Sequence, residues 1–125
     1  MSQQATATYN FSGCDVLVTG GSSGIGYGIA QAFKQAGATV HITGTRAAAT
    51  DYDDVDLSDM IYHRLSAGDK DSIYQFAASL HKLDILVNNA GANLLMQEGG
   101  EWDKDNFEES VSINLFFGFH LVECQ

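Results

Sequence analysis

A glycine-rich stretch, Thr19 to Gly26 (TGGSSGIG), most constrains the fold of this chain. It follows Val16 to Val18, a short β-branched run typical of a fully buried parallel strand. Apolar residues at helical spacing come directly after it, from Ile25 to Ala36, and Gly37 supplies a helix stop. A flexible linker would separate two units, whereas these glycines join a strand to a helix that begins at once.

A tight turn from strand to helix needs residues without a Cβ, both to turn and to let backbone N–H groups approach a ligand. The helix start also offers unpaired N–H donors and a partial positive charge, which together suit a pyrophosphate. The pattern therefore favours a phosphate cradle, although a tight turn without a ligand remains an alternative. The predicted cradle comprises Gly20, Ser22, Ser23, Gly24, Ile25 and Gly26.

The rest of the chain continues the alternation of strands and helices. Such an alternation predicts an α/β fold, a doubly wound parallel sheet with right-handed crossovers, of which this sequence holds about four strands. Strands are expected at Thr39–Thr43, Ile61–Leu65 and Ile85–Val87, helices over Ile73–Leu80 and from Asp105 to at least Val122, and loops at Gly44–Asp59 and from Asn88 to about Trp102.

Composition and net charge narrow the range of partners and cellular locations that this chain can have. The chain has 125 residues, enough for one small domain, and a net charge of −10, which argues against nucleic acid and anionic membranes as partners. The acids cluster in Asp51–Asp59 and Glu98–Glu109, and none lies between Asp15 and Asp51, so the glycine stretch sits in a neutral-to-basic segment. Met1 to Thr8 lacks the features of a signal peptide, and no apolar run is long enough to span a membrane, so we expect a cytoplasmic protein.

Neither the cysteines nor the histidines predict a metal site. Cys14 and Cys124 have no zinc spacing and are expected to be buried or half-buried free thiols. His120 would share a helix face with Cys124, but two ligands are too few for a metal. The other histidines, His41, His63 and His81, are expected to be ordinary strand or surface residues.

Three segments occur in an order and spacing that resemble a known family. These are Thr19 to Gly26 (a TGxxxGxG loop), Leu83 to Gly91 (LDILVNNAG) and Ile113 to Leu115 (INL), with Phe107 where an aromatic residue often opens the helix before the last segment. Jointly, from Val16 onward, they resemble the short-chain dehydrogenase/reductase family. The resemblance implies a Rossmann-type sheet and hydride transfer between a nicotinamide cofactor and an alcohol or carbonyl substrate.

The resemblance also implies roles for single residues. Asn89, Ala90 and Gly91 would support the central sheet and line the cofactor. Asn114 would be the catalytic-site asparagine that organises a proton-relay water near the catalytic lysine. The helix that carries it packs against a second subunit in relatives, which implies a homo-oligomer.

The cofactor can be narrowed further at the end of the second strand. An acid there would bind the ribose hydroxyls of NAD, but this chain has Thr45 and Arg46 instead, and Arg46 could pair with a ribose phosphate. We therefore favour NADP over NAD, with a solvated loop arginine as the alternative. Ser23 argues against this preference for NADP, because many NADP-preferring relatives carry a basic residue at its position. For the adenine, relatives often place an aspartate where this chain has Ser66 and Ala67. We assign these two residues to the cofactor site, where Ser66 could replace the aspartate or the adenine could be held mainly by stacking.

The family's acid–base pair is absent from the sequence, because none of the five tyrosines has a lysine four residues later. We expect residues 1–13 to be a polar tail and residues 14–125 to be a truncated dinucleotide-binding domain, inactive alone and pairing with a missing C-terminal part or a second copy. A non-enzymatic nucleotide-binding or interaction module of the same fold remains the main alternative. A methyltransferase using S-adenosylmethionine is a weaker one.

Overall fold

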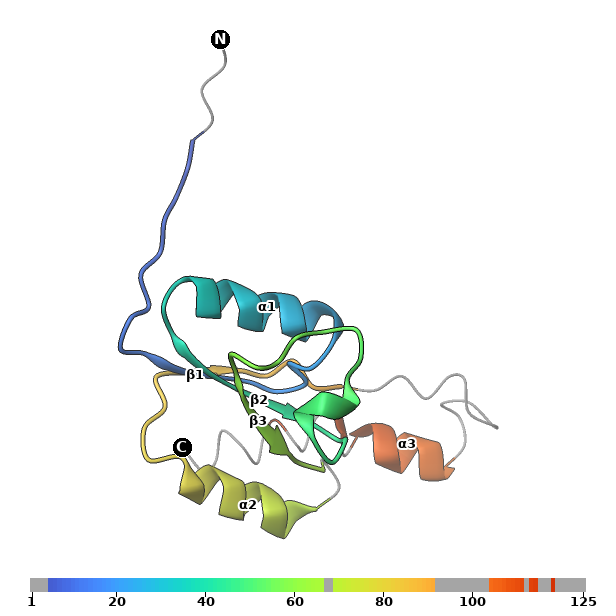
Figure 1. Cartoon of the computed structure of the whole chain (residues 1–125). Helices are drawn as coiled ribbons and strands as arrows, with labels where there is room; N and C mark the ends of the chain where they lie inside the picture. The colour runs from blue at the N-terminus through green and yellow to red at the C-terminus, as the bar shows by residue number, and fades with distance from the viewer. Residues whose placement is uncertain (1–4, 67–68, 92–103, 112, 115–117, 119–125) are drawn as a thin grey trace.

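The computed structural model describes residues 5–66, 69–91, 104–111, 113, 114 and 118. A four-stranded parallel sheet forms its centre, in the order β3-β2-β1-β4 (Figure 1). This arrangement confirms the predicted doubly wound parallel sheet. The strands are β1 (Asp15–Val18), β2 (Thr39–Gly44), β3 (Ile61–Arg64) and β4 (Ile85–Val87), and the helices are α1 (Gly24–Gln35), α2 (Lys70–Ser79), α3 (Lys104–Val111) and a 3₁₀ turn, η1 (Ala49–Asp51).

Helices α1 and α2 cover opposite faces of the sheet (Figure 1). Val16 and Val18 of β1 belong to the cluster beneath α1 that includes Ala30. Leu17 points to the other face and is also fully buried. The central strand is therefore covered on both sides, as its unbroken apolar run predicts.

The helix boundaries follow from their caps. Gly37, just after α1, has φ 98° and donates its N–H to Lys34 O, which confirms the predicted helix stop. Helix α2 begins earlier than the apolar spacing indicates, because the Asp69 side chain caps it by accepting from Ser72 N at 3.1 Å. The described part of α3 ends at Val111.

The remaining predictions about elements have mixed outcomes. The second strand extends one residue further than expected, to Gly44, and the rest of the predicted loop, up to Asp59, is confirmed apart from η1. The third strand ends one residue earlier than expected, at Arg64. The extension of the last helix to Val122 lies outside the described residues except at positions 113, 114 and 118, and most of the loop after Asn88 lies outside them as well.

Hydrogen bonds and ion pairs link the amino ends of β1 and β4 and fix the register of the two strands. Asp15 N donates to Asp84 Oδ2 at 2.8 Å, and Asp84 N donates to Asp15 O at 2.9 Å. Lys82 Nζ lies 3.5 Å from the Asp15 carboxylate and 3.3 Å from that of Asp84. With this register set, the carboxyl ends of the two strands finish side by side.

The described residues contain neither a helix long and apolar enough to cross a bilayer nor a group of side chains that could hold a metal ion. Cys14 is a half-buried free thiol, as expected, and Cys124 lies outside the described residues.

The sheet brings together two histidines that are far apart in the sequence. His41 of β2 and His63 of β3 lie with Nδ1 and Nε2 3.0 Å apart, and the His63 ring packs on Phe76 of α2. Burial lowers the pKa of His41, although Asp15 partly offsets this effect. Burial and the neighbouring His41 lower the pKa of His63. Both rings are therefore neutral at pH 7 in the folded protein.

This pair predicts a loss of stability in mild acid. An unfolded histidine takes up its proton near pH 6.5, whereas both folded rings resist protonation to lower pH. The contribution to stability is thus full above about pH 6.5 and falls as pH drops toward the folded pKa values. We expect thermal unfolding measured from about pH 7.5 to about pH 5.5 to show a decline that His63→Gln reduces. His81→Gln, at an exposed position, is the control and should keep the decline. An unchanged decline in His63→Gln would contradict this assignment.

Candidate functional site

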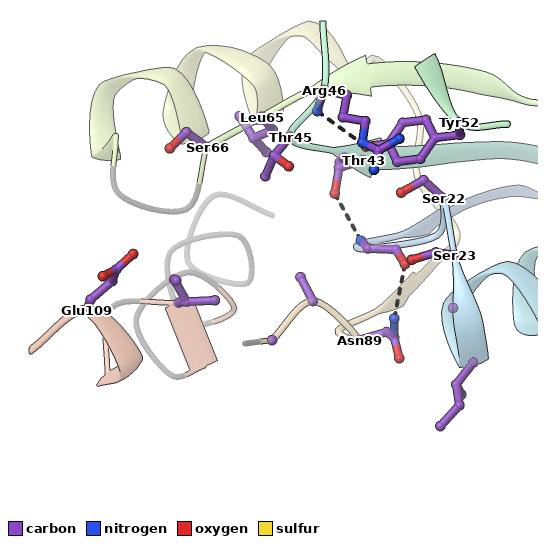
Figure 2. A pocket seen from close by; sticks show the side chains of 17 residues that line it. Ser22, Ser23, Thr43, Thr45, Arg46, Tyr52, Leu65, Ser66, Asn89 and Glu109 are labelled. Atoms are coloured by element: carbon purple, nitrogen blue, oxygen red, sulfur yellow. Dashed lines mark hydrogen bonds between the residues drawn. The ribbon is translucent and has the colours of Figure 1, made fainter. Parts of the chain in front are cut away.

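A cavity of about 810 Å³ lies at the carboxyl ends of the strands (Figure 2). Its walls come from the loops that follow β1, β2, β3 and β4, together with α3 and the residues just after it. The lining residues are Gly20, Ser22, Ser23, Ile25, Gly26, Thr43, Gly44, Thr45, Arg46, Tyr52, Leu65, Ser66, Asn89, Ala90, Gly91, Glu109 and Ile113.

The glycines of the loop after β1 and of the first turn of α1 have different physical roles. Gly20 and Gly24 have φ values of 66° and 57°, in the left-handed region that side chains with a Cβ rarely adopt. A Cβ on Gly24 would point into open space. A Cβ on Gly26 would instead collide with Gly20 O and the Asn89 amide nitrogen. Gly26 therefore lets α1 approach the loop closely, and Gly24 leaves the approach to the helix start clear.

The start of α1 faces the cavity. Ser23 is the N-cap in an extended conformation, and its side chain makes no cap hydrogen bond. The first turn carries no acid. Ile25 lines the cavity and is 78% exposed, although it is a large apolar residue. The helix start is thus an electropositive, uncapped end beside an exposed apolar side chain.

Thr19 and Asn89 form a polar clamp between the ends of β1 and β4. The Thr19 hydroxyl accepts from the backbone N–H groups of Asn89 and Ala90, each at 3.0 Å, and donates to Val87 O at 3.4 Å. The Asn89 side chain donates to Thr19 O at 3.2 Å and to Gly20 O at 3.3 Å. Thr19 is only 1% exposed, so its hydroxyl lies away from water, whereas Asn89 is half-buried. We refer to this set of bonds as the Thr19–Asn89 clamp.

A second contact ties the loop to β2. Gly20 N donates to the Thr43 hydroxyl at 3.2 Å, and Thr43 is buried. A Cβ on Gly21 would lie 2.5 Å from Ile42 Cγ2, so this glycine lets the loop rest on β2. Two neighbouring strands therefore hold the loop.

One end of the cavity carries a positive charge. The guanidinium carbon of Arg46 lies 4.8 Å from the centre of the Tyr52 ring, and Nη1 donates to Asp51 O at 2.5 Å. Figure 2 shows Arg46 beside Tyr52 and Thr45, with Glu109 at the other end of the cavity. Arg46 is thus held at the rim by a ring and a backbone carbonyl.

Most of the residues assigned from sequence meet around this one cavity. Gly24 does not line it but begins α1, between the lining residues Ser23 and Ile25. Ala67 lies outside the described residues. Asn114 is exposed, and its Oδ1 lies 2.7 Å from where a Cβ on Gly91 would be, which places it next to the lining without forming part of it. The assigned residues that line the cavity are Gly20, Ser22, Ser23, Ile25, Gly26, Thr45, Arg46, Ser66, Asn89, Ala90 and Gly91.

Sequence reasoning missed several members of the site. Thr43 carried a usable signal, because it stands at the carboxyl end of a buried strand. Tyr52 carried none, since it lies in a loop whose path the sequence does not specify. The other missed lining residues are Gly44, Leu65, Glu109 and Ile113, and Thr19 was missed as a clamp residue.

Comparison with known proteins gives a consistent set of similarities. The family model for short chain dehydrogenases matches residues 15–124. A 3-oxoacyl-(acyl-carrier-protein) reductase of Chlamydia pneumoniae is 35% identical over 82% of this chain and 44% of its own length. Human L-xylulose reductase is 34% identical over 80% of this chain and 41% of its own length. The chain thus spans less than half the length of these curated relatives.

Solved structures agree with the sequence comparisons. A short chain dehydrogenase/reductase family protein has a TM-score of 0.73 at 32% identity, over 92% of this chain and 49% of its own. A complex of Pseudomonas aeruginosa RhlG with NADP has a TM-score of 0.72 at 28% identity, over 93% of this chain and 46% of its own.

The Thr19–Asn89 clamp predicts an unequal effect of two adjacent substitutions. Asn89→Ala removes both side-chain hydrogen bonds and leaves the carbonyls of Thr19 and Gly20 without these donors. We expect it to lower the free energy of unfolding by roughly 1–3 kcal/mol in urea titrations. Asn88→Ala, at the exposed neighbouring position, should change it by less than about 0.5 kcal/mol. Equal effects at the two positions would contradict the clamp.

Proposed function

This chain belongs to the short chain dehydrogenase family, and we propose that it forms the nicotinamide-cofactor site of an oxidoreductase acting on a small alcohol or carbonyl substrate. The observation that carries the proposal is the position of the cavity. It lies where the loops after β1, β2 and β4 meet the uncapped start of α1. Doubly wound sheets bind dinucleotides at this place.

The glycine loop would hold the pyrophosphate of the cofactor. Gly24 leaves open space in front of the helix start, so phosphate oxygens could approach the backbone N–H groups there. Ser22 and Ser23 line the same region, and their hydroxyls can donate to phosphate. No acid occupies the first turn of α1 to oppose this charge.

The two ends of the cavity would bind the two ends of the cofactor. Arg46, Thr45, Leu65 and Ser66 would surround the adenosine, with Arg46 available to the ribose phosphate that distinguishes NADP from NAD. The segment Asn89 to Gly91 would lie along the nicotinamide half. We propose NADP as the preferred cofactor.

The bound cofactor would supply the hydride chemistry, and this chain's residues would bind and orient it. Asn114, next to Gly91, is proposed to help order a water for proton transfer. No tyrosine in the sequence is followed by a lysine at the fourth position, so we propose that these residues alone bind the cofactor without turnover.

Cofactor binding gives a direct test at Gly24. Gly24→Val would place a branched side chain in the open approach to the helix start and strain a backbone with φ 57°. We expect the affinity for NADPH, measured by calorimetry, to be lost. Gly28→Ala is the control, because Gly28 lies on the exposed side of α1, where a Cβ meets nothing within 4 Å. It should keep the affinity. NADPH binding retained by Gly24→Val would overturn the proposed cradle.

Arg46 tests the choice of cofactor. Arg46→Ala should weaken NADPH binding by one to two decades, since a charge-assisted pair contributes roughly 1.5–3 kcal/mol. NADH, which has no ribose phosphate, should lose much less. Arg64→Ala is the control, because Arg64 is an exposed arginine of β3 that does not line the cavity. Equal losses for both cofactors in Arg46→Ala would remove the argument for NADP.

A further inference from the structure

Two tyrosines from different parts of the chain meet above the end of β2. Tyr52 follows η1 and Tyr62 belongs to β3, and their hydroxyl oxygens lie 3.1 Å apart. Both hydroxyls lie against Gly44, the last residue of β2. A Cβ on Gly44 would collide with the Tyr52 hydroxyl and come within 2.8 Å of the Tyr62 hydroxyl. Gly44 is not among the glycines with positive φ. Its lack of a side chain therefore serves to make room for the two hydroxyls.

The two hydroxyls close a ring of hydrogen bonds with the backbone of Arg46. Tyr62 donates to Arg46 O at 2.6 Å, and Arg46 N donates to the Tyr52 hydroxyl at 3.3 Å. Because Tyr62 has a single proton and uses it on Arg46, Tyr52 is left to donate to Tyr62. Burial raises the pKa of Tyr62, so it remains a donor throughout the neutral range.

The Arg46 side chain is held as well as its backbone. Its guanidinium lies over the Tyr52 ring, and one nitrogen donates to Asp51 O. That bond uses one of five N–H donors, which leaves the planar group able to bind an anion. A second hollow of about 120 Å³ borders Arg46 and Tyr52 and is also lined by Ser22, Ser23, Asp53, Asp54 and Val55.

We propose that Tyr52 and Tyr62 are positioning residues that hold Arg46 ready for the 2′-phosphate of the adenosine ribose. The inference rests on the proposed function, because it needs a nucleotide in the cavity. A long exposed arginine would otherwise have to be ordered by the ligand, which weakens binding. An arginine fixed beforehand by two hydroxyls, an aromatic face and a carbonyl avoids most of that loss.

Two ligands that differ only in the 2′-phosphate test the inference. The affinities of 2′,5′-ADP and 5′-AMP are measured by calorimetry for the wild type, Tyr52→Phe and Tyr62→Phe. Each phenylalanine keeps the ring and removes one hydroxyl. We expect the preference for 2′,5′-ADP to fall by about two- to tenfold in each variant, with 5′-AMP binding nearly unchanged. Tyr9→Phe is the control, because Tyr9 is 71% exposed, belongs to the N-terminal segment and does not line the cavity. This variant should keep the preference for 2′,5′-ADP.

The same substitutions in an Arg46→Ala background separate positioning from a general structural role. If the tyrosines act through the guanidinium, Tyr62→Phe should have no further effect on the preference once Arg46 is alanine. Thermal unfolding of each variant checks that it is folded.

The outcomes distinguish the two proposals. A wild-type protein that binds neither ligand would refute the proposed function, and this inference with it. A wild type that prefers 2′,5′-ADP, with tyrosine variants that keep the full preference, would refute the inference alone. Equal losses for both ligands in the tyrosine variants would also refute it, because they indicate a structural role only.

Discussion

The buried hydroxyl of Thr19 holds three backbone groups where β1 and β4 end, and the shape of the candidate site depends on that contact. The amide of Asn89 adds two bonds back to the carbonyls at the start of the glycine loop. Because an unsatisfied buried polar group costs more than a satisfied one contributes, this set of bonds favours one arrangement of the two strand ends strongly over others. Gly20 then leaves β1 with positive φ, and α1 begins with its N-terminus toward the cavity.

The glycines complete this arrangement through their lack of side chains, each for a different reason. Gly26 allows α1 to lie against Gly20 O and Asn89, so the clamp and the helix fix one another. Gly24 leaves the space in front of the helix open, and Gly44 makes room for the tyrosine hydroxyls that hold Arg46. Glycine thus serves three purposes in one site: close packing of α1 at Gly26, open space at the helix start at Gly24, and room for two tyrosine hydroxyls at Gly44.

Much of this could be predicted from the sequence, because the features concerned are local. The run Val16 to Val18, the glycine loop and the helix stop at Gly37 are contiguous patterns, and they gave the strand, turn and helix correctly. The contacts of Tyr52 and the pairing of His41 with His63 depend on how a loop folds back and on which strands become neighbours. Such contacts between distant residues leave no periodic signal, and the sequence therefore indicated Arg46 but not the residues that hold it.

We propose that the cavity at the carboxyl ends of the strands binds a nicotinamide dinucleotide through the glycine loop. A titration of NADPH into ¹⁵N-labelled protein, followed by the amide signals, tests it most directly. We expect the signals of Gly20 to Gly26, Arg46 and Asn89 to Gly91 to shift together and to saturate at one ligand per chain. Shifts confined to residues away from this cavity, or no saturable shifts at all, would contradict it.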